Sequence, residues 1–318
     1  MALDFNSVKF LLWAKNLGVS FERTLTLGHQ GFCCSPGQFK RAVKDFGMTA
    51  TPDEIKRCFH HAPMTPLYAD NFFRFLGATE TASVDRSDFE DATLLHDLNE
   101  RFPENVRGHF DLVVDGGTLE HIFNYPAALR NCLELLHVGG HFVTITPASG
   151  QMGHGFYQFS PELFFRVFRA ENGFALRKII LFDCSKPESD FYEVNDPAAT
   201  GQRTELILSK PLLMIVLAQK TAEVPVFAEL PQQSDYAAGW ASHEKSNAGD
   251  QARSHLGLFG RLRIKMNPYW PFWLRRYRDA LVYRRHHGAP SLNNPRQFRR
   301  LKPREIYCER GSLHVQKS

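Results

Sequence analysis

Hydrophobic residues form two kinds of pattern along the first part of the chain, continuous apolar runs and apolar residues at helical spacing. Residues 110–147 show both: a continuous apolar run at 112–114, apolar residues at helical spacing over 127–136, and a second apolar run from 142. Such runs are typical of strands covered on both faces, and the helical spacing predicts a crossover helix between them, ended by the Gly-Gly pair at 139–140. The stretch therefore predicts a right-handed βαβ unit, whose ligands bind at the carboxyl edge of the sheet.

The same patterns predict the other elements. Helices are expected over 36–46, 52–61, 68–76 and 161–172, and strands over 23–27, 82–85, 92–97, 174–182 and 206–217. Thr51 and Glu54 have the spacing of a capping box, which marks the start of the second of these helices. The alternation of strands and helices predicts an α/β fold with a doubly wound, mostly parallel sheet.

Composition and charge divide the chain into segments. We expect an N-terminal helix in 1–20, amphipathic and at the domain edge, a main domain over 21–221, a polar linker over 222–252 and a basic extension over 253–318. Residues 253–304 hold 14 Lys and Arg and one acid, a local balance of +13, whereas the first 252 residues balance at −9. This asymmetry of charge indicates that the acidic main part and the basic C-terminal segment are organised separately.

Several classes of protein are disfavoured. No apolar run of about 18 residues predicts a membrane span, and the N-terminus lacks a basic leader. The six cysteines show neither paired spacing nor a CxxC motif, so we expect a cytoplasmic protein without disulfides. The histidine pairs at 60–61 and 286–287 lack company at metal-ligand spacing, so no metal site is expected.

Three acidic residues stand at predicted strand ends: Asp85 in ASVD, Asp97 in ATLLHDLN and Asp115 in FDLVVDGGTLEHIF. In this order and spacing, residues 20–220 resemble a class I S-adenosylmethionine (SAM)-dependent methyltransferase. The resemblance implies SAM as cofactor, with Asp85 binding the ribose hydroxyls. A carboxylate suits that role because it can accept hydrogen bonds from both hydroxyls.

The rest of the implied cofactor site follows the next two strands. The resemblance implies that Asp97, flanked by Leu98, holds the adenine amine. It also places Asp115, Gly116 and Gly117 beside the methionine portion, where negative groups balance the sulfonium charge and glycine allows close approach of the backbone.

The first strand departs from the family pattern. Thr26 stands where the family usually has an acid, and Gln30 replaces the second glycine of the turn; Gly28 remains, and Gly31 comes one place early. Two interpretations stay open: altered SAM binding, in which Gln30 or His29 replaces lost contacts, or a domain that no longer binds SAM. The ribose, adenine and sulfonium positions favour the first.

Methyl transfer to a hydroxyl needs a proton acceptor. His121, after the fourth strand, and His154, after the fifth, are the candidate catalytic bases, since an imidazole titrates near neutral pH. Each also has a purely structural interpretation, as a helix-start residue and as a surface turn. Tyr157 and Gln158 are expected to line the acceptor pocket, and Glu120 is expected to be solvated.

These observations predict a SAM-dependent methyltransferase acting on a hydroxyl or amine of a small-molecule or carbohydrate-type acceptor. The alternative is a degenerate, non-catalytic methyltransferase-like module that binds an anionic partner. The basic segment 253–304 is consistent with peripheral contact with an anionic surface of the inner membrane, or with pairing to the acidic body; nucleic acid is the least favoured partner, since no RNA-binding signature accompanies the charge. A nicotinamide-dependent enzyme would need a Gly-x-Gly-x-x-Gly turn that LGHQGF does not provide.

Overall fold

The computed structural model forms two compact units. Residues 2–61, 65–247, 271, 273–274, 276–278, 281 and 288–310 are described. The first unit comprises Met1–Val194, Leu208–Pro231 and Arg300–Ser318, and the second comprises Asn195–Ile207 and Gln232–Arg299. The candidate chemistry lies in the first unit.

The first unit is built on a mostly parallel sheet with the strand order β9-β8-β10-β7-β6-β2-β4-β5. Strand β10 is reversed relative to both of its neighbours, β7 and β8. The strands are β2 (Arg23–Leu27), β4 (Glu80–Asp85), β5 (Leu94–Leu95), β6 (Phe110–Asp115), β7 (Leu136–Ser149), β8 (Phe174–Asp183), β9 (Tyr192–Val194) and β10 (Leu212–Lys220). The predicted doubly wound, mostly parallel α/β sheet is confirmed.

The order of the strands changes direction at β2. The chain first adds β4 and β5 on one side of β2, and then crosses over to add β6 and β7 on the other side. Leu27, the last residue of β2, pairs with Val84 on one side and with Asp115 on the other. The carboxyl ends of β2, β4 and β6 therefore meet at one edge, and the point between β2 and β6 is where doubly wound sheets bind ligands.

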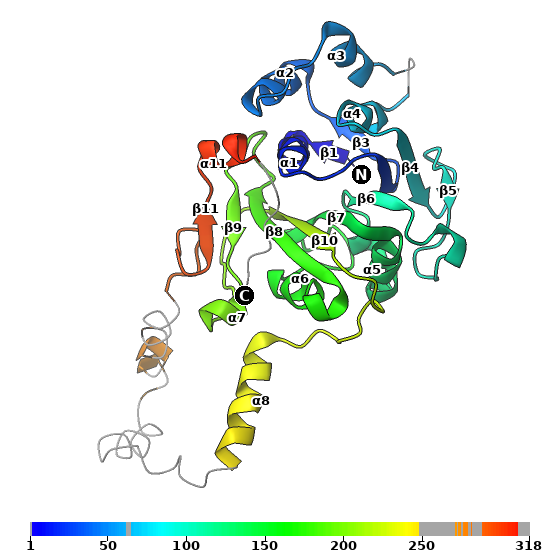
Figure 1. The fold of residues 1–318 in the computed structure, drawn as a ribbon. Helices are drawn as coiled ribbons and strands as arrows, with labels where there is room; N and C mark the ends of the chain where they lie inside the picture. The colour runs from blue at the N-terminus through cyan, green and yellow to red at the C-terminus, as the bar shows by residue number, and fades with distance from the viewer. Residues whose placement is uncertain are drawn as a thin grey trace. The chain divides into compact units, whose positions relative to one another are not determined.

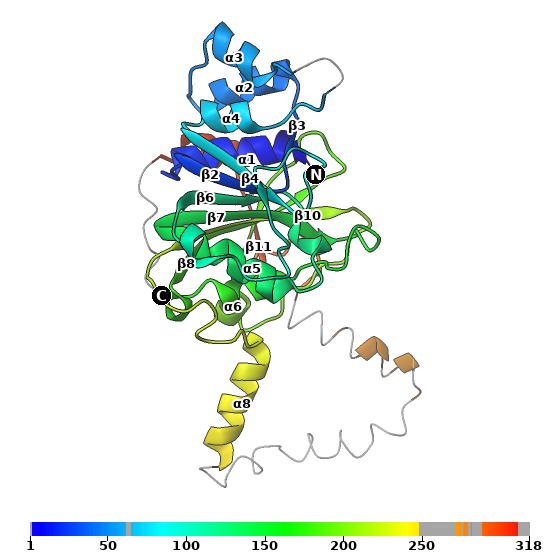
Figure 2. The ribbon, with the colours of Figure 1, turned by 90° about the vertical axis from the view of Figure 1, so that its right-hand side faces the viewer.

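Helices cover both faces of this sheet (Figures 1 and 2). On one face lie α1 (Phe5–Asn16), α2 (Pro36–Asp45), α3 (Pro52–Cys58) and α4 (Asp70–Phe75), and on the other lie α5 (Tyr125–Glu134) and α6 (Pro161–Val167). Thr51 and Glu54 form the predicted capping box at the start of α3. Short additions are β1 (Ala2–Asp4), which pairs in parallel with β3 (Gly31–Cys33), the 3-10 turns Glu104–Val106, Leu119–His121 and Ala170–Asn172, and α11 (Pro303–Cys308).

Helix α1 corrects one prediction. It is not amphipathic at a domain edge, because every residue from Phe5 to Ala14 is buried. Its polar positions are satisfied by a loop far along the chain: Ser189 donates its backbone N–H to Asn6 (2.8 Å), and Lys9 donates to the Ser189 carbonyl (3.4 Å). Buried polar groups need such partners, and a local pattern cannot reveal them.

Four further predictions need correction. Gly139 and Gly140 do not end the crossover helix, because α5 stops at Glu134 and the pairing of β7 with β6 already begins at Leu136. Strand β5 keeps only two of the six predicted residues. The late strand begins at Leu212 rather than 206, after Lys210 and Pro211, and the helix predicted over 161–172 ends at Val167 and resumes as the 3-10 turn.

The second unit contains α7 (Pro197–Thr200) and α8 (Ser234–Asn247), and β11 (Phe298–Arg300) spans the boundary between the units. Helix α8 lies within the segment predicted to be a linker. Most of the basic segment 253–304 falls outside the described residues, so its role stays a prediction. No helix among the described residues is both long and apolar enough to cross a membrane.

Candidate functional site at the carboxyl edge of the sheet

The turn after β6 is organised by the carboxylate of Asp115. This side chain is fully buried. Its Oδ1 accepts hydrogen bonds from the backbone N–H groups of Gly117, Thr118 and Leu119 at 2.7–3.3 Å, and its Oδ2 accepts one from the Thr144 hydroxyl at 2.7 Å. Both oxygens thus accept hydrogen bonds from within the protein. The carboxylate therefore fixes the conformation of the turn that contains Gly116 and Gly117.

The first loop meets this turn at the switch point of the sheet. Gln30 is buried, and its side-chain N–H donates to the Leu27 carbonyl. Its Oε1 has no hydrogen-bond partner among the residues that the structure describes, and it lies so close to Gly116 that a Cβ there would stand 2.2 Å from it. A larger residue at position 116 would therefore displace the Gln30 side chain. Gln30 Oε1 is therefore a buried acceptor that could receive a hydrogen bond from a ligand.

The other residues of the first loop are held by the protein. Thr26, at the position where the resemblance expects an acid, donates its hydroxyl hydrogen to the Gly28 carbonyl at 2.8 Å. His29 stacks on Tyr68 with ring centroids 3.5 Å apart, and its Nε2 lies 2.7 Å from Asp70. Burial lowers the pKa of His29, but hydrogen bonds to Asp70 and to a backbone carbonyl outweigh it, so the pKa is raised. Gly31 lies in β3 and contributes to the small sheet.

Asp85 is the last residue of β4, and Asp97 follows β5 at the same edge. Asp85 Oδ1 accepts from the Arg86 backbone N–H at 2.6 Å, and its other oxygen makes no hydrogen bond to the described residues. Asp97 Oδ1 accepts from the backbone and side chain of Asn99, which lowers the pKa of Asp97. Leu98 is buried. The free Asp85 oxygen suits a hydroxyl donor.

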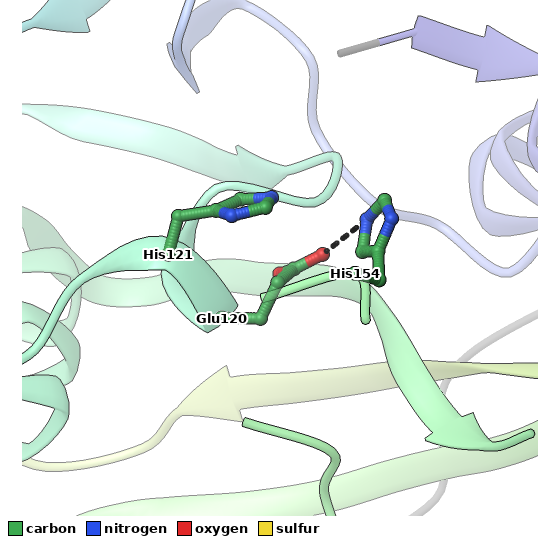
Figure 3. Close-up of side chains that lie close together, drawn as sticks. All are labelled: Glu120, His121 and His154. Atoms are coloured by element: carbon green, nitrogen blue, oxygen red, sulfur yellow. Dashed lines mark ion pairs between the residues drawn. The ribbon is translucent and has the colours of Figure 1, made fainter. Parts of the chain in front are cut away.

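A buried carboxylate and two imidazoles come together beside the Asp115 turn (Figure 3). Glu120 and His121 belong to the 3-10 turn Leu119–His121, and His154 comes from the loop after β7. The His154 Nε2 lies 3.4 Å from Glu120 Oε1, and the two histidine rings are 5.2 Å apart. One ligand atom from each of the three residues lies within 4.8 Å of the others. The two candidate bases are therefore neighbours.

Glu120 is not solvated, contrary to the expectation. Its side chain is 1% exposed, and neither carboxylate oxygen has a hydrogen-bond partner among the described residues. Burial, with the nearby Asp115 charge, raises the pKa of Glu120 to about 8; the Thr146 hydroxyl opposes this shift, although the two groups do not meet hydrogen-bond geometry. Burial and the proximity of His154 lower the pKa of His121. A cation at this place would compensate the charge of the buried carboxylate.

The loop that carries His154 is fastened to Glu120 through the backbone. The N–H groups of Phe156 and Tyr157 both donate to the Glu120 carbonyl, at 2.8 and 3.3 Å. Gly155 makes this possible, since a Cβ there would lie 2.9 Å from the same carbonyl oxygen. The phenol of Tyr157 donates to the Phe123 carbonyl at 2.6 Å.

The two residues predicted to line the acceptor pocket both make internal contacts. Besides the bond of Tyr157, the Gln158 oxygen accepts from the Gln151 N–H at 2.8 Å and closes the loop. Their role toward an acceptor stays a prediction. Phe123 and Phe156 are 75% and 68% exposed with their rings in edge contact, so they form an apolar surface next in sequence to this loop and to His121.

The sequence interpretation missed Glu120 as a site residue. The sequence did place Glu120 beside His121, directly after the turn at the end of a strand. The burial of Glu120, however, depends on the loop 151–158, which folds over it. The structure brings His121, His154 and Glu120 together, and it places Asp85, Asp97 and the Asp115 turn at the same sheet edge. Each of the cofactor assignments stays a prediction.

Comparison with known proteins gives only distant likenesses. No protein-family model matches the chain, and no curated protein sequence matches it. Among solved structures, it is similar to a possible histamine N-methyltransferase from Thermotoga maritima (14% identity, 69% of this chain and 90% of that chain, TM-score 0.34). It is also similar to a SAM-dependent methyltransferase from Mesorhizobium loti (16%, 66% and 95%, TM-score 0.35).

A third similar structure is the 1,6-didemethyltoxoflavin-N1-methyltransferase of Burkholderia thailandensis, which contains S-adenosylhomocysteine (14% identity, 69% of this chain and 78% of that chain, TM-score 0.35). TM-scores this low do not by themselves assign a fold. The fold assignment rests on the chain's own sheet, with its reversal of strand order at β2 and its helices on both faces. On that basis, the chain has a Rossmann-like, doubly wound α/β fold.

Proposed function

We propose that this protein is a SAM-dependent methyltransferase that acts on a hydroxyl or amine of a small-molecule or carbohydrate-type acceptor. The observation that carries the proposal is the set of acceptor groups at one sheet edge. Asp85 has a free oxygen, and Gln30 and Glu120 have buried oxygens without partners among the described residues. This set suits a ligand that is rich in donors and positively charged.

The chain's residues would divide the cofactor between them. Asp85 would accept hydrogen bonds from the ribose hydroxyls, and Asp97 with Leu98 would face the adenine. The Asp115 turn, with Gly116 and Gly117, would lie along the methionine portion. Gln30 Oε1 would accept from the cofactor's amino group and so replace the glycine contact that the first loop lacks. The contacts of Asp85 and Gln30 would satisfy acceptors that the described residues leave open, whereas Asp97 already accepts hydrogen bonds from Asn99.

When bound, SAM supplies a methyl group whose bond to sulfur breaks, with the electron pair left on sulfur, as the acceptor atom bonds to the carbon. The chain's task is then to orient the acceptor and to take its proton. Nδ1 of His154 is suited to accept the proton, because Nε2 lies 3.4 Å from Glu120 Oε1 and the ionised form of this carboxylate would stabilise the imidazolium that forms. His121 lies beside it, and its lowered pKa keeps its imidazole neutral near pH 7.

Isothermal titration with SAM and with S-adenosylhomocysteine tests this proposal. We expect binding of one equivalent of each, followed by methyl transfer from labelled SAM to fractions of a small-molecule extract. The absence of binding up to millimolar SAM would refute it.

A second candidate function is favoured by the first loop. Thr26 and Gln30 satisfy the Gly28 and Leu27 carbonyls from within the chain, so this loop holds its shape without a ligand. A non-catalytic module that binds an anionic partner is consistent with this, and with the charge of residues 253–304. Binding of SAM with turnover would exclude it. A cytoplasmic location and contact with an anionic membrane surface stay predictions.

A further inference from the structure

The cluster of Glu120, His121 and His154 has a chemistry that the proposed methyl transfer does not use. Two imidazoles and one carboxylate form the ligand set of several catalytic zinc sites and of mononuclear iron sites. The sequence predicted no metal site, because the histidine pairs at 60–61 and 286–287 lack further ligands at suitable spacing. The fold brings the third member from 33 positions further along the chain.

The geometry points to a binding site for one first-row divalent cation, with zinc the best match, held by Glu120, His121 and His154. Two ligands about 2.0–2.1 Å from a tetrahedral ion stand roughly 3.3 Å apart. The distance from His154 Nε2 to Glu120 Oε1, 3.4 Å, already has this value. His121 completes the set within 4.8 Å and is exposed, so a side-chain rotation is enough to bring its nitrogen into range.

The second observation is the state of the Glu120 carboxylate. It is 1% exposed, and within the described part of the chain its oxygens accept no hydrogen bond and no Lys or Arg pairs with them. A buried carboxylate in this condition is costly unless it is neutralised or coordinates a metal. The neighbouring Asp115 differs, because its carboxylate already accepts hydrogen bonds from three backbone N–H groups and from Thr144.

Such an ion would have at least one coordination position without a protein ligand, on the side of the exposed histidines. Their side chains reach the surface, with His154 48% exposed. A three-ligand site with an open position binds water or a substrate oxygen and acts as a Lewis acid. Its use in catalysis rests on the proposed function: an acceptor hydroxyl would bind the ion through oxygen, release its proton to water, and keep the electron pair that forms the new bond to carbon. The histidines would then be ligands rather than bases.

Metal binding to the full-length, metal-free protein tests the site without SAM. Co2+ binding followed by visible absorption, and Zn2+ binding followed by equilibrium dialysis, are measured for the wild type, Glu120→Gln, His154→Gln and the control His96→Gln. His96 is a histidine of the same sheet edge with a ring nitrogen 3.0 Å from the Glu100 carbonyl, outside the cluster. Competition by Zn2+ for the bound Co2+ establishes that both ions use one site.

We expect one equivalent of ion with an absorption spectrum of nitrogen and oxygen ligation. Glu120→Gln and His154→Gln should each weaken binding at least about tenfold, the loss that removal of a second-shell partner alone can cause, while His96→Gln should bind as the wild type does. Unchanged affinity in both cluster variants, equal loss in the control, or a thiolate spectrum would overturn the inference. His154 is partly exposed, so its variant remains informative if Glu120→Gln fails to fold.

The two proposals fail separately. Zn2+ bound at the cluster without any SAM binding would refute the methyltransferase function and leave the metal site standing. Binding of SAM and turnover in the presence of a chelator, with no Zn2+ bound, would do the reverse and return His154 to the role of a base.

Discussion

The side-chain oxygen of Gln30 lies against Gly116 so closely that a Cβ on residue 116 would stand 2.2 Å from it and 2.7 Å from the Gln30 Cδ. This contact joins the first loop to the turn after β6 at the switch point of the sheet. It explains how the chain departs from the glycine-rich pattern and still closes the loop: a long amide fills the space, and the glycine opposite accommodates it.

Gly116→Ala should therefore displace the Gln30 side chain. We expect a loss of about 1–3 kcal/mol in the free energy of unfolding, as for other insertions into packed interiors, together with weaker SAM binding. The double variant Gly116→Ala/Gln30→Ala should recover stability, because the obstruction is gone. Gly37→Ala in α2 is the matched control, since a Cβ there meets nothing within 4 Å. Urea denaturation measures all four proteins.

Asp115 should act through its hydrogen bonds. Asp115→Ala leaves three backbone N–H groups and the Thr144 hydroxyl without their acceptor, and we expect a loss of about 3 kcal/mol or more in the free energy of unfolding. Asp115→Asn should cost much less, because its oxygen can still accept from the backbone and Thr144 can accept from its amide. Equal losses in both variants would instead show that the negative charge is needed.

Asp85 should act on the ligand and not on the fold. Asp85→Asn keeps the shape but loses charge-assisted acceptance by the free oxygen, so SAM binding measured by calorimetry should weaken about tenfold or more. Its unfolding free energy should change by less than about 0.5 kcal/mol. Asp88→Asn, at an exposed position three residues later, should leave the SAM affinity unchanged; if both variants bind equally well, Asp85 is not a ribose ligand.

His141 should make the stability of the protein depend on pH. The ring is 3% exposed with neither nitrogen hydrogen-bonded among the described residues, and burial, with the charges of Arg177 and His137, lowers its pKa from 6.5 to about 4. Between these values the unfolded chain binds a proton that the folded chain does not, so this residue's contribution to stability is present above pH 6.5 and falls as pH drops toward 4. The loss amounts to at most about 3 kcal/mol.

His141→Leu should flatten this part of the stability curve, measured by urea denaturation at pH 7, 6, 5 and 4.5. His60→Gln, at an exposed position, serves as the control and should follow the wild type. An unchanged slope in His141→Leu would mean that other groups dominate acid unfolding.

The sequence predicted the parts of the fold that depend on neighbours along the chain. Strand β2 agrees with its predicted bounds, and β6 contains the predicted apolar run at 112–114, because short apolar runs between turn residues specify both strands. The capping box of Thr51 and Glu54 is equally local. By contrast, the burial of α1 depends on residue 189, and the end of α5 depends on where pairing with β6 begins; neither is encoded within a short window of sequence.

The candidate site shows the same division. Asp85, Asp97 and Asp115 could be placed at one edge because parallel strands end together. The internal engagement of the Asp115 carboxylate could not be predicted, since it depends on Thr144 in the next strand. The burial of Glu120 could not be predicted either, because the covering loop returns from residue 155.

The two backbone hydrogen bonds to the Glu120 carbonyl join the turn at 119–121 to the loop that carries His154. A displacement of the turn at 119–121, whether by a ligand or by a substitution, must carry the loop with His154 in the same direction. The backbone positions of His121 and His154 are therefore held together during any such movement, while each imidazole can still rotate about its own side-chain bonds.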